Sequence, residues 1–165
     1  MNDTQSTGEC KGMVCPITGC PIKKVLMATI VTFLVTMAYD WVFHGHYMMP
    51  DYLATASMWR TEAEMQSLFG ICMLYHAVLA FGVAGLYCFV GKNASCGGAC
   101  PKTGLKFGLL LGLIIGISHF ASYIWMPIPM AMAVKWLVGS VIWGLITGFV
   151  LSLLSKKCCC SKTTA

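Results

Sequence analysis

Charged residues are scarce in this chain, since lysine, arginine, aspartate and glutamate together make up 10% of its 165 residues. Hydrophobic residues make up 58%, and the mean hydropathy is +0.75. A soluble domain of this length needs more polar surface than that. The composition therefore excludes an ordinary globular protein and indicates an integral membrane protein.

Sequence motifs of common enzyme classes are also missing. The chain has no nucleophile elbow, Walker loop, dinucleotide fingerprint or His-Glu-x-x-His stretch. Its apolar stretches lack a chain of acids and bases that could relay protons, because Asp40 is the one carboxylate near any of them. We therefore expect no enzymatic activity.

Four apolar stretches are long enough to cross a bilayer, at residues 25–43, 68–90, 105–126 and 131–154. Spanning ~30 Å of hydrocarbon takes roughly 20 apolar residues in a helix. The sequence thus predicts an all-α integral membrane bundle of four transmembrane helices over residues 22–155. A mobile, cysteine-rich cytoplasmic leader at 1–21 and a cysteine-rich cytoplasmic tail at 156–165 are expected to flank it.

Lysines are distributed unequally between the two predicted sides of the membrane. One side carries only Arg60 and Lys135, and the other carries nine lysines: Lys11, Lys23, Lys24, Lys92, Lys102, Lys106, Lys156, Lys157 and Lys162. The positive-inside rule then places both termini in the cytoplasm. The lysines are dispersed beside apolar helices, so we expect the lipid bilayer as partner and no nucleic acid.

The predicted outer side carries local helix signals and aromatic residues. Residues 50–60 are typical of a short interfacial helix, and Thr61 with Glu64 forms a capping-box pattern that begins the second helix. Prolines at 127 and 129 predict a tight non-helical turn between the last two helices. An aromatic belt is expected at this interface, formed by Tyr39, Trp41, Tyr47, Trp59, Tyr123, Trp125 and Trp136.

Small residues recur every fourth position on the third and fourth apolar stretches. The two rows are Gly104, Gly108, Gly112 and Gly116, and Ser140, Gly144, Gly148 and Ser152. Such rows let helix backbones approach closely in lipid. They predict a tightly packed antiparallel pair, with homo-oligomerisation through one of the rows as the alternative.

Ionisable residues inside a bilayer are costly and usually functional. Asp40 and His44 share a face near the outer end of the first helix, and His76 and His119 lie at a matching depth in the second and third. Together these four residues would suit a copper or zinc ion, or haem. The alternative is that each histidine has a separate structural partner.

Cysteines gather in the predicted cytoplasmic segments, where a reducing environment disfavours disulfides. Their spacings match neither a zinc knuckle nor a ferredoxin run. We interpret them as a weaker, soft-metal or thiol-redox group, whose candidate ligands are Cys10, Cys15, Cys20, Cys96 and Cys100.

Three segments together resemble a group of small bacterial inner-membrane proteins of about four helices that has no assigned activity. They are residues 40–45, residues 52–60 with Glu64 and Met65, and residues 126–129 with Tyr123, Ala133 and Trp136. The resemblance covers roughly residues 22–155, and it implies a multi-pass protein of the bacterial inner membrane. The cysteine clusters, His46 and His119 lie outside the shared pattern.

The leading hypothesis is a non-enzymatic membrane protein that binds a transition metal or small ligand in an outer-facing His/Asp pocket. A second hypothesis is an accessory subunit of a larger membrane complex, or a homo-oligomer, packed through the glycine rows. A third is a small transporter built from two similar hairpins, opened by Cys20-Pro21 and Cys100-Pro101.

Overall fold

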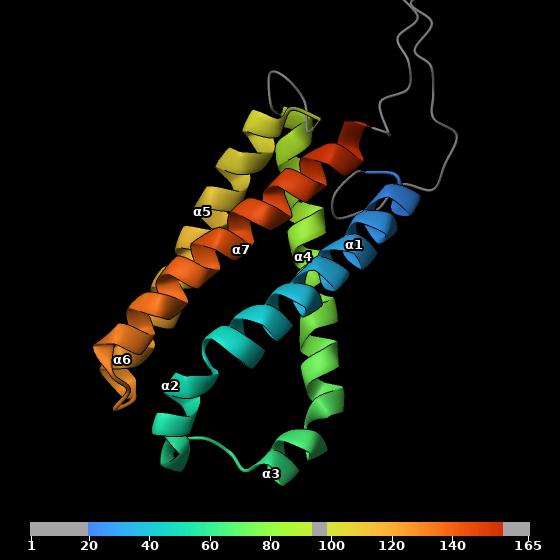
Figure 1. The fold of residues 1–165 in the computed structure, drawn as a ribbon. Helices are drawn as coiled ribbons and strands as arrows, with labels where there is room; N and C mark the ends of the chain where they lie inside the picture. Colours follow the sequence, from blue (N-terminus) through green and yellow to red (C-terminus); the bar gives the residue numbers. More distant parts are fainter. Residues whose placement is uncertain (1–19, 94–98, 157–165) are drawn as a thin grey trace, which may run out of the picture.

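The computed structural model describes residues 20–93 and 99–156, and it is built from helices (Figure 1). Four helical spans are long and apolar enough to cross a membrane: Ile22–Tyr47, Phe69–Gly91, Pro101–Trp125 and Met130–Ser155. Within the described residues there is no strand. The prediction of an all-α fold with four helices long and apolar enough to cross a membrane is therefore confirmed. Residues 1–19, 94–98 and 157–165 lie outside the described part, and they include all of the predicted leader except residues 20 and 21 and all of the predicted tail except residue 156.

The helices α5 (Pro101–Phe120) and α7 (Met130–Lys156) pack side by side along their lengths (Figure 1). The two rows of small residues face each other across this contact. A Cβ atom added at Gly112 would lie 2.7 Å from the Ser140 carbonyl oxygen and 2.8 Å from the Val141 Cα. One added at Gly108 would collide with the Gly144 backbone. The two helices are antiparallel, and each row of small residues packs against the other row.

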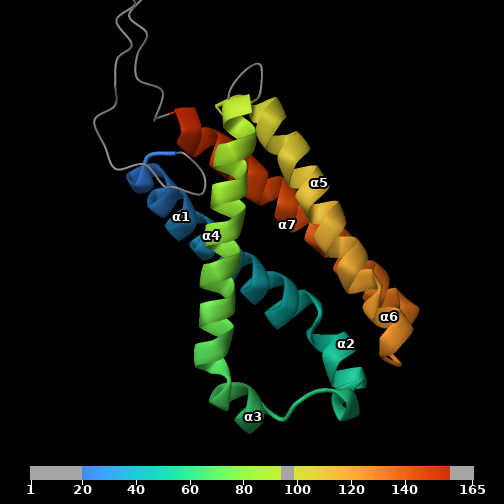
Figure 2. The same cartoon turned by 180° about the vertical axis from the view of Figure 1, so that it is seen from behind.

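The other long pair, α1 (Ile22–Val42) and α4 (Phe69–Asn93), crosses instead of running alongside. The two helices meet near their middles, and their ends toward α2 and α3 separate (Figure 1, Figure 2). Helix α1 also contacts α7 through two polar links. Tyr39 donates from its hydroxyl to the Gly139 carbonyl at 2.7 Å, and Trp143 donates from Nε1 to Thr36 Oγ1 at 3.1 Å.

Short segments connect α1 to α4. A π-helical turn at Phe43–Tyr47 follows α1 and leads into α2 (Met49–Ala54). A 3₁₀ turn at Ala56–Met58 and the short helix α3 (Glu62–Ser67) come next. The segment expected as one helix over 50–60 is thus divided in two after Ala54. The Thr61–Glu64 capping box is confirmed, since each residue accepts a hydrogen bond from the backbone of the other. The Thr61 hydroxyl bond also lowers the pKa of Glu64.

The connecting segment is held against the start of α7. Met48 is fully buried there with Met132 and Ala133, and Lys135 Nζ lies 2.7 Å and 3.0 Å from the two carboxylate oxygens of Asp51. The short helix α6 (Ser122–Trp125) ends before the non-helical residues 126–129, as the two prolines predict. The contacts of Met48 and Asp51 hold α2 beside α7, while α3 and α4 lie further from α7 (Figure 2).

Candidate functional site

A cavity of about 530 Å³ lies between the two helix pairs, at the end that carries α2, α3 and α6. All four residues predicted as outer-pocket ligands line it: Asp40, His44, His76 and His119. Most of the remaining wall is aromatic or apolar: Tyr39, Phe43, Tyr52, Tyr75, Leu79, Ile115, Met126, Trp136 and Trp143. The arrangement is a largely apolar pocket with a few convergent polar groups, which is the usual composition of a small-molecule site.

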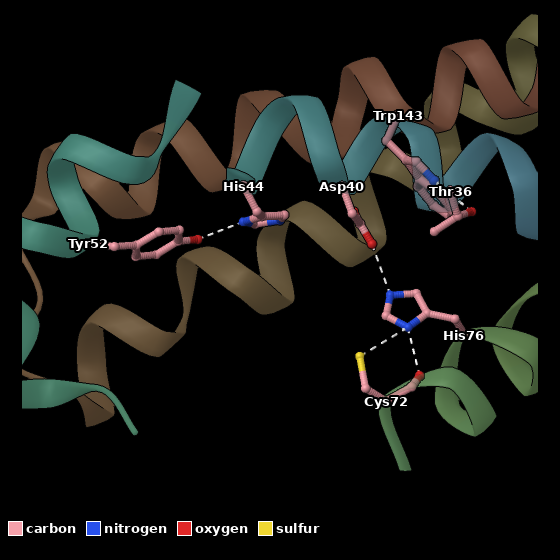
Figure 3. A network of polar contacts seen from close by, with 7 residues as sticks. All are labelled: Thr36, Asp40, His44, Tyr52, Cys72, His76 and Trp143. Carbon is pink, nitrogen blue, oxygen red and sulfur yellow. Dashed lines mark hydrogen bonds and ion pairs between the residues drawn. The ribbon is translucent and has the colours of Figure 1, made fainter. Parts of the chain in front are cut away.

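Asp40 and His76 form a hydrogen-bonded pair that joins α1 to α4 (Figure 3). The distance from His76 Nε2 to Asp40 Oδ2 is 2.9 Å, and the His76 side chain is 13% exposed. His76 Nδ1 lies 2.7 Å from the Cys72 carbonyl oxygen and 3.5 Å from the Cys72 sulfur. Both ring nitrogens therefore face oxygen acceptors. A ring nitrogen of His76 that carries a hydrogen donates it to the oxygen that it faces, so both bonds form when both nitrogens carry one.

His44 belongs to a different hydrogen-bond chain, whose centre is the Tyr52 hydroxyl from α2 (Figure 3). Trp136 Nε1 donates to the Tyr52 oxygen at 3.1 Å, and the same oxygen lies 2.6 Å from His44 Nδ1. Trp136 can only donate to this oxygen, and among the described residues His44 Nδ1 is the one acceptor within hydrogen-bond distance of the Tyr52 hydroxyl. We therefore assign the hydroxyl hydrogen to the bond with His44. Burial raises the pKa of Tyr52, since a buried phenolate would lose its hydration.

His119, on α5, has a third set of partners on α7. Its Nδ1 lies 3.0 Å from Ser140 Oγ, and the Ser140 hydroxyl is 2.8 Å from the Trp136 carbonyl oxygen. A serine hydroxyl carries one hydrogen, which goes to the carbonyl, so Ser140 accepts from His119. His119 therefore reaches across the α5–α7 pair, next to the row of small residues.

The structure thus brings the four predicted ligands to one cavity but gives them separate partners. Within the described ranges, no three His, Cys, Asp or Glu side chains are placed to hold one metal ion. His46 does not line the cavity and packs edge-on against Trp41. The geometry therefore presents imidazoles and one carboxylate as hydrogen-bonding groups around an open volume.

The predicted cytoplasmic thiols are only partly within the described residues. Cys20 is buried beside Val25 and Cys88, and Cys100 immediately precedes α5. Cys10, Cys15 and Cys96 lie outside the part of the chain that the structure describes. Both described cysteines of this group are absent from the cavity lining.

Several lining residues were assigned other roles from the sequence. The sequence predicts Tyr39 and Trp136 in the aromatic belt, Tyr52 within the interfacial helix over 50–60, and Ser140 in a row of small residues. One available signal was the spacing of Thr36, Asp40 and His44, which places three polar side chains on one face of an apolar helix. Trp41 and Trp125, at 67% and 81% exposed, do lie on the outside of the bundle.

Comparisons of this chain with protein-family models, with curated proteins and with solved structures found no match. The resemblance to small bacterial inner-membrane proteins therefore rests on the segments quoted above.

Proposed function

We propose that this chain is a non-enzymatic, multi-pass membrane protein that binds a small organic ligand carrying a ring. The supporting observation is the cavity of about 530 Å³, in which hydrogen-bonding side chains stand among aromatic ones. Aromatic walls favour a flat ring through stacked and edge-on contacts. Polar groups at fixed positions would then orient it.

The lysine distribution supports an orientation with both termini in the cytoplasm. The cavity then lies in the outer half of the membrane, and the family resemblance suggests the inner membrane of a bacterium. In this orientation a ligand would reach the cavity from the outer solution or from the outer leaflet.

An organic ligand fits the geometry better than a metal ion in this pocket. A first-row transition metal needs three or four donors converging on a point about 2 Å from each. Here Asp40 and His76 bond each other, while His44 and His119 bond Tyr52 and Ser140. Elemental analysis of the purified protein would decide the question, and stoichiometric zinc or copper lost in His44→Ala would favour the metal.

Docking through the glycine rows receives less support than ligand binding. Each row packs against the other within the chain, so neither is open to a second protein. A larger complex would need to form through another face of the bundle.

The test uses 1-aminoanthracene, a fluorescent ring compound whose emission rises in apolar cavities. Purified protein in mild detergent should bind it saturably at one site per chain. Ile115→Trp adds bulk to a lining position and should weaken binding at least tenfold. Ile114→Trp, one residue away but 66% exposed to the lipid side, is the matched control and should leave binding unchanged.

Equal binding by both tryptophan variants would contradict the proposal, because the probe would then partition into detergent or another surface. Thermal unfolding of each variant checks that the bundle is intact. Loss of binding in Ile115→Trp with an unfolding temperature near that of the natural chain would support the cavity.

A further inference from the structure

The hydrogen bonds around the cavity leave two ring nitrogens unpaired, and these restrict the chemistry of the ligand. The inference rests on the proposed function, since it concerns what the same cavity would bind. A hydroxyl carries one hydrogen, and a neutral imidazole carries one N–H and one lone-pair nitrogen. The Asp40–His76 pair is set aside, because its two members bond each other.

His119 presents a hydrogen-bond acceptor to the cavity. Its Nδ1 must carry the ring hydrogen, because Ser140 gives its own hydrogen to the Trp136 carbonyl and can only accept from His119. A neutral imidazole has one N–H, so Nε2 is left with a lone pair. No hydrogen bond to Nε2 occurs within the described residues.

His44 presents the opposite group. Tyr52 receives a hydrogen bond from Trp136 and gives its own hydrogen to His44 Nδ1. The ring hydrogen of His44 is then on Nε2, which becomes a donor. It too lacks a partner in the described part of the chain. His44 and His119 both line this cavity, so the donor and the acceptor belong to one site.

A group that serves both histidines must donate one hydrogen and also accept one. A hydroxyl is the smallest group that does so, whereas an ether or quinone oxygen only accepts and an ammonium only donates. In a membrane interior an unpaired polar group has no water to bond with, so the penalty for a mismatch is large. The aromatic wall requires the hydroxyl to sit on a ring.

We propose that the cavity selects an aromatic ring bearing a phenolic hydroxyl. The hydroxyl hydrogen goes to His119 Nε2, and the hydroxyl oxygen accepts from His44 Nε2–H. The ring lies among the aromatic side chains that line the cavity. Tyr52 and Ser140 act as positioning residues, because they fix which nitrogen of each imidazole carries the hydrogen.

The experiment measures displacement of 1-aminoanthracene at pH 8, above the ordinary range in which imidazole titrates. The competitors are 1-naphthol and 1-methoxynaphthalene, which share a ring system and differ in the hydroxyl hydrogen. We expect 1-naphthol to bind about fivefold or more tightly, which corresponds to one net hydrogen bond. Equal displacement by the two would overturn the hydroxyl inference while leaving the ring-binding function intact. Failure of 1-aminoanthracene to bind would count against the proposed function instead.

Two variants test the role of His119 and of the serine that orients it. His119→Phe should reduce the preference for 1-naphthol to about onefold, because the accepting nitrogen is gone. Ser140→Ala is a smaller change that removes the acceptor for Nδ1–H, so the ring hydrogen can move to Nε2 and the preference should fall. Retention of the full preference in Ser140→Ala would overturn the assignment.

Nitrogen NMR of histidine-labelled protein gives a readout that folding alone does not change. The resonances of His119 should show Nδ1 protonated and Nε2 bare, and those of His44 should show the reverse. Finding the same tautomer for both residues would overturn the proposal, whatever the binding data show.

Discussion

Gly112→Ala should destabilise the bundle through the α5–α7 contact, and the size of the effect follows from the space around the glycine. The added methyl carbon would lie 2.7 Å from the Ser140 carbonyl oxygen and 2.8 Å from the Val141 Cα, whereas ordinary contact begins near 3.4 Å. Both obstacles are backbone atoms, so the helices themselves must move apart. Overpacking of this kind costs about 1–3 kcal/mol.

Gly82→Ala on α4 is the matched control, because nothing lies within 4 Å of its added methyl carbon. Both substitutions gain helix propensity, worth about 1 kcal/mol at most. The free energy of unfolding should therefore be about 1–3 kcal/mol lower for Gly112→Ala than for Gly82→Ala. Titration with a denaturing detergent, followed by circular dichroism, measures that difference. A difference below about 0.5 kcal/mol would refute the reasoning that backbone contact limits this interface.

Three further predictions concern contacts outside the glycine rows. Asp51→Asn weakens the partly exposed ion pair with Lys135 and should lower the free energy of unfolding slightly, with a smaller loss in high salt. Trp143→Phe leaves the Thr36 hydroxyl without its donor and should cost about 1 kcal/mol in the same unfolding assay, whereas equal stability would show that the bond contributes nothing. Burial raises the pKa of Tyr52, so the folded state favours the protonated phenol, and the stability this contributes is lost as pH rises through the raised value. Alkaline absorbance titration should show one tyrosine fewer ionising late in Tyr52→Phe than in the natural chain.

The membrane helices could be predicted from sequence because hydrocarbon thickness sets the length of an apolar span. Residues 25–43 and 131–154 lie inside Ile22–Tyr47 and Met130–Ser155, two of the helical segments that are long and apolar enough to cross a membrane. The Thr61–Glu64 capping box was equally accessible, since its partners lie three residues apart on one helix. Features that depend on local spacing or on the bilayer are those that one sequence can specify.

The sequence predicts that His44, His76 and His119 line one pocket, but it does not predict their hydrogen-bond partners. His44 bonds Tyr52 only because the π-helical turn at Phe43–Tyr47 brings α2 back beside the end of α1. The bond from His119 to Ser140 depends on the register of α5 against α7. These contacts join positions whose relative placement no periodicity in the sequence determines.

The position of the cavity follows from the difference between the two helix pairs. Small residues let α5 and α7 meet at their backbones, so that pair encloses little volume. Helix α1 meets α7 through the large side chains of Tyr39 and Trp143, near the α2 end of the bundle. Helix α4 diverges from α1 on the same side (Figure 2), and the cavity lies between the two helix pairs there. Trp143→Leu replaces a large side chain at this contact with a smaller one. It should bring α1 toward α7 and reduce binding of 1-aminoanthracene. Unchanged binding in that variant would show that the cavity depends on the divergence of α4 alone.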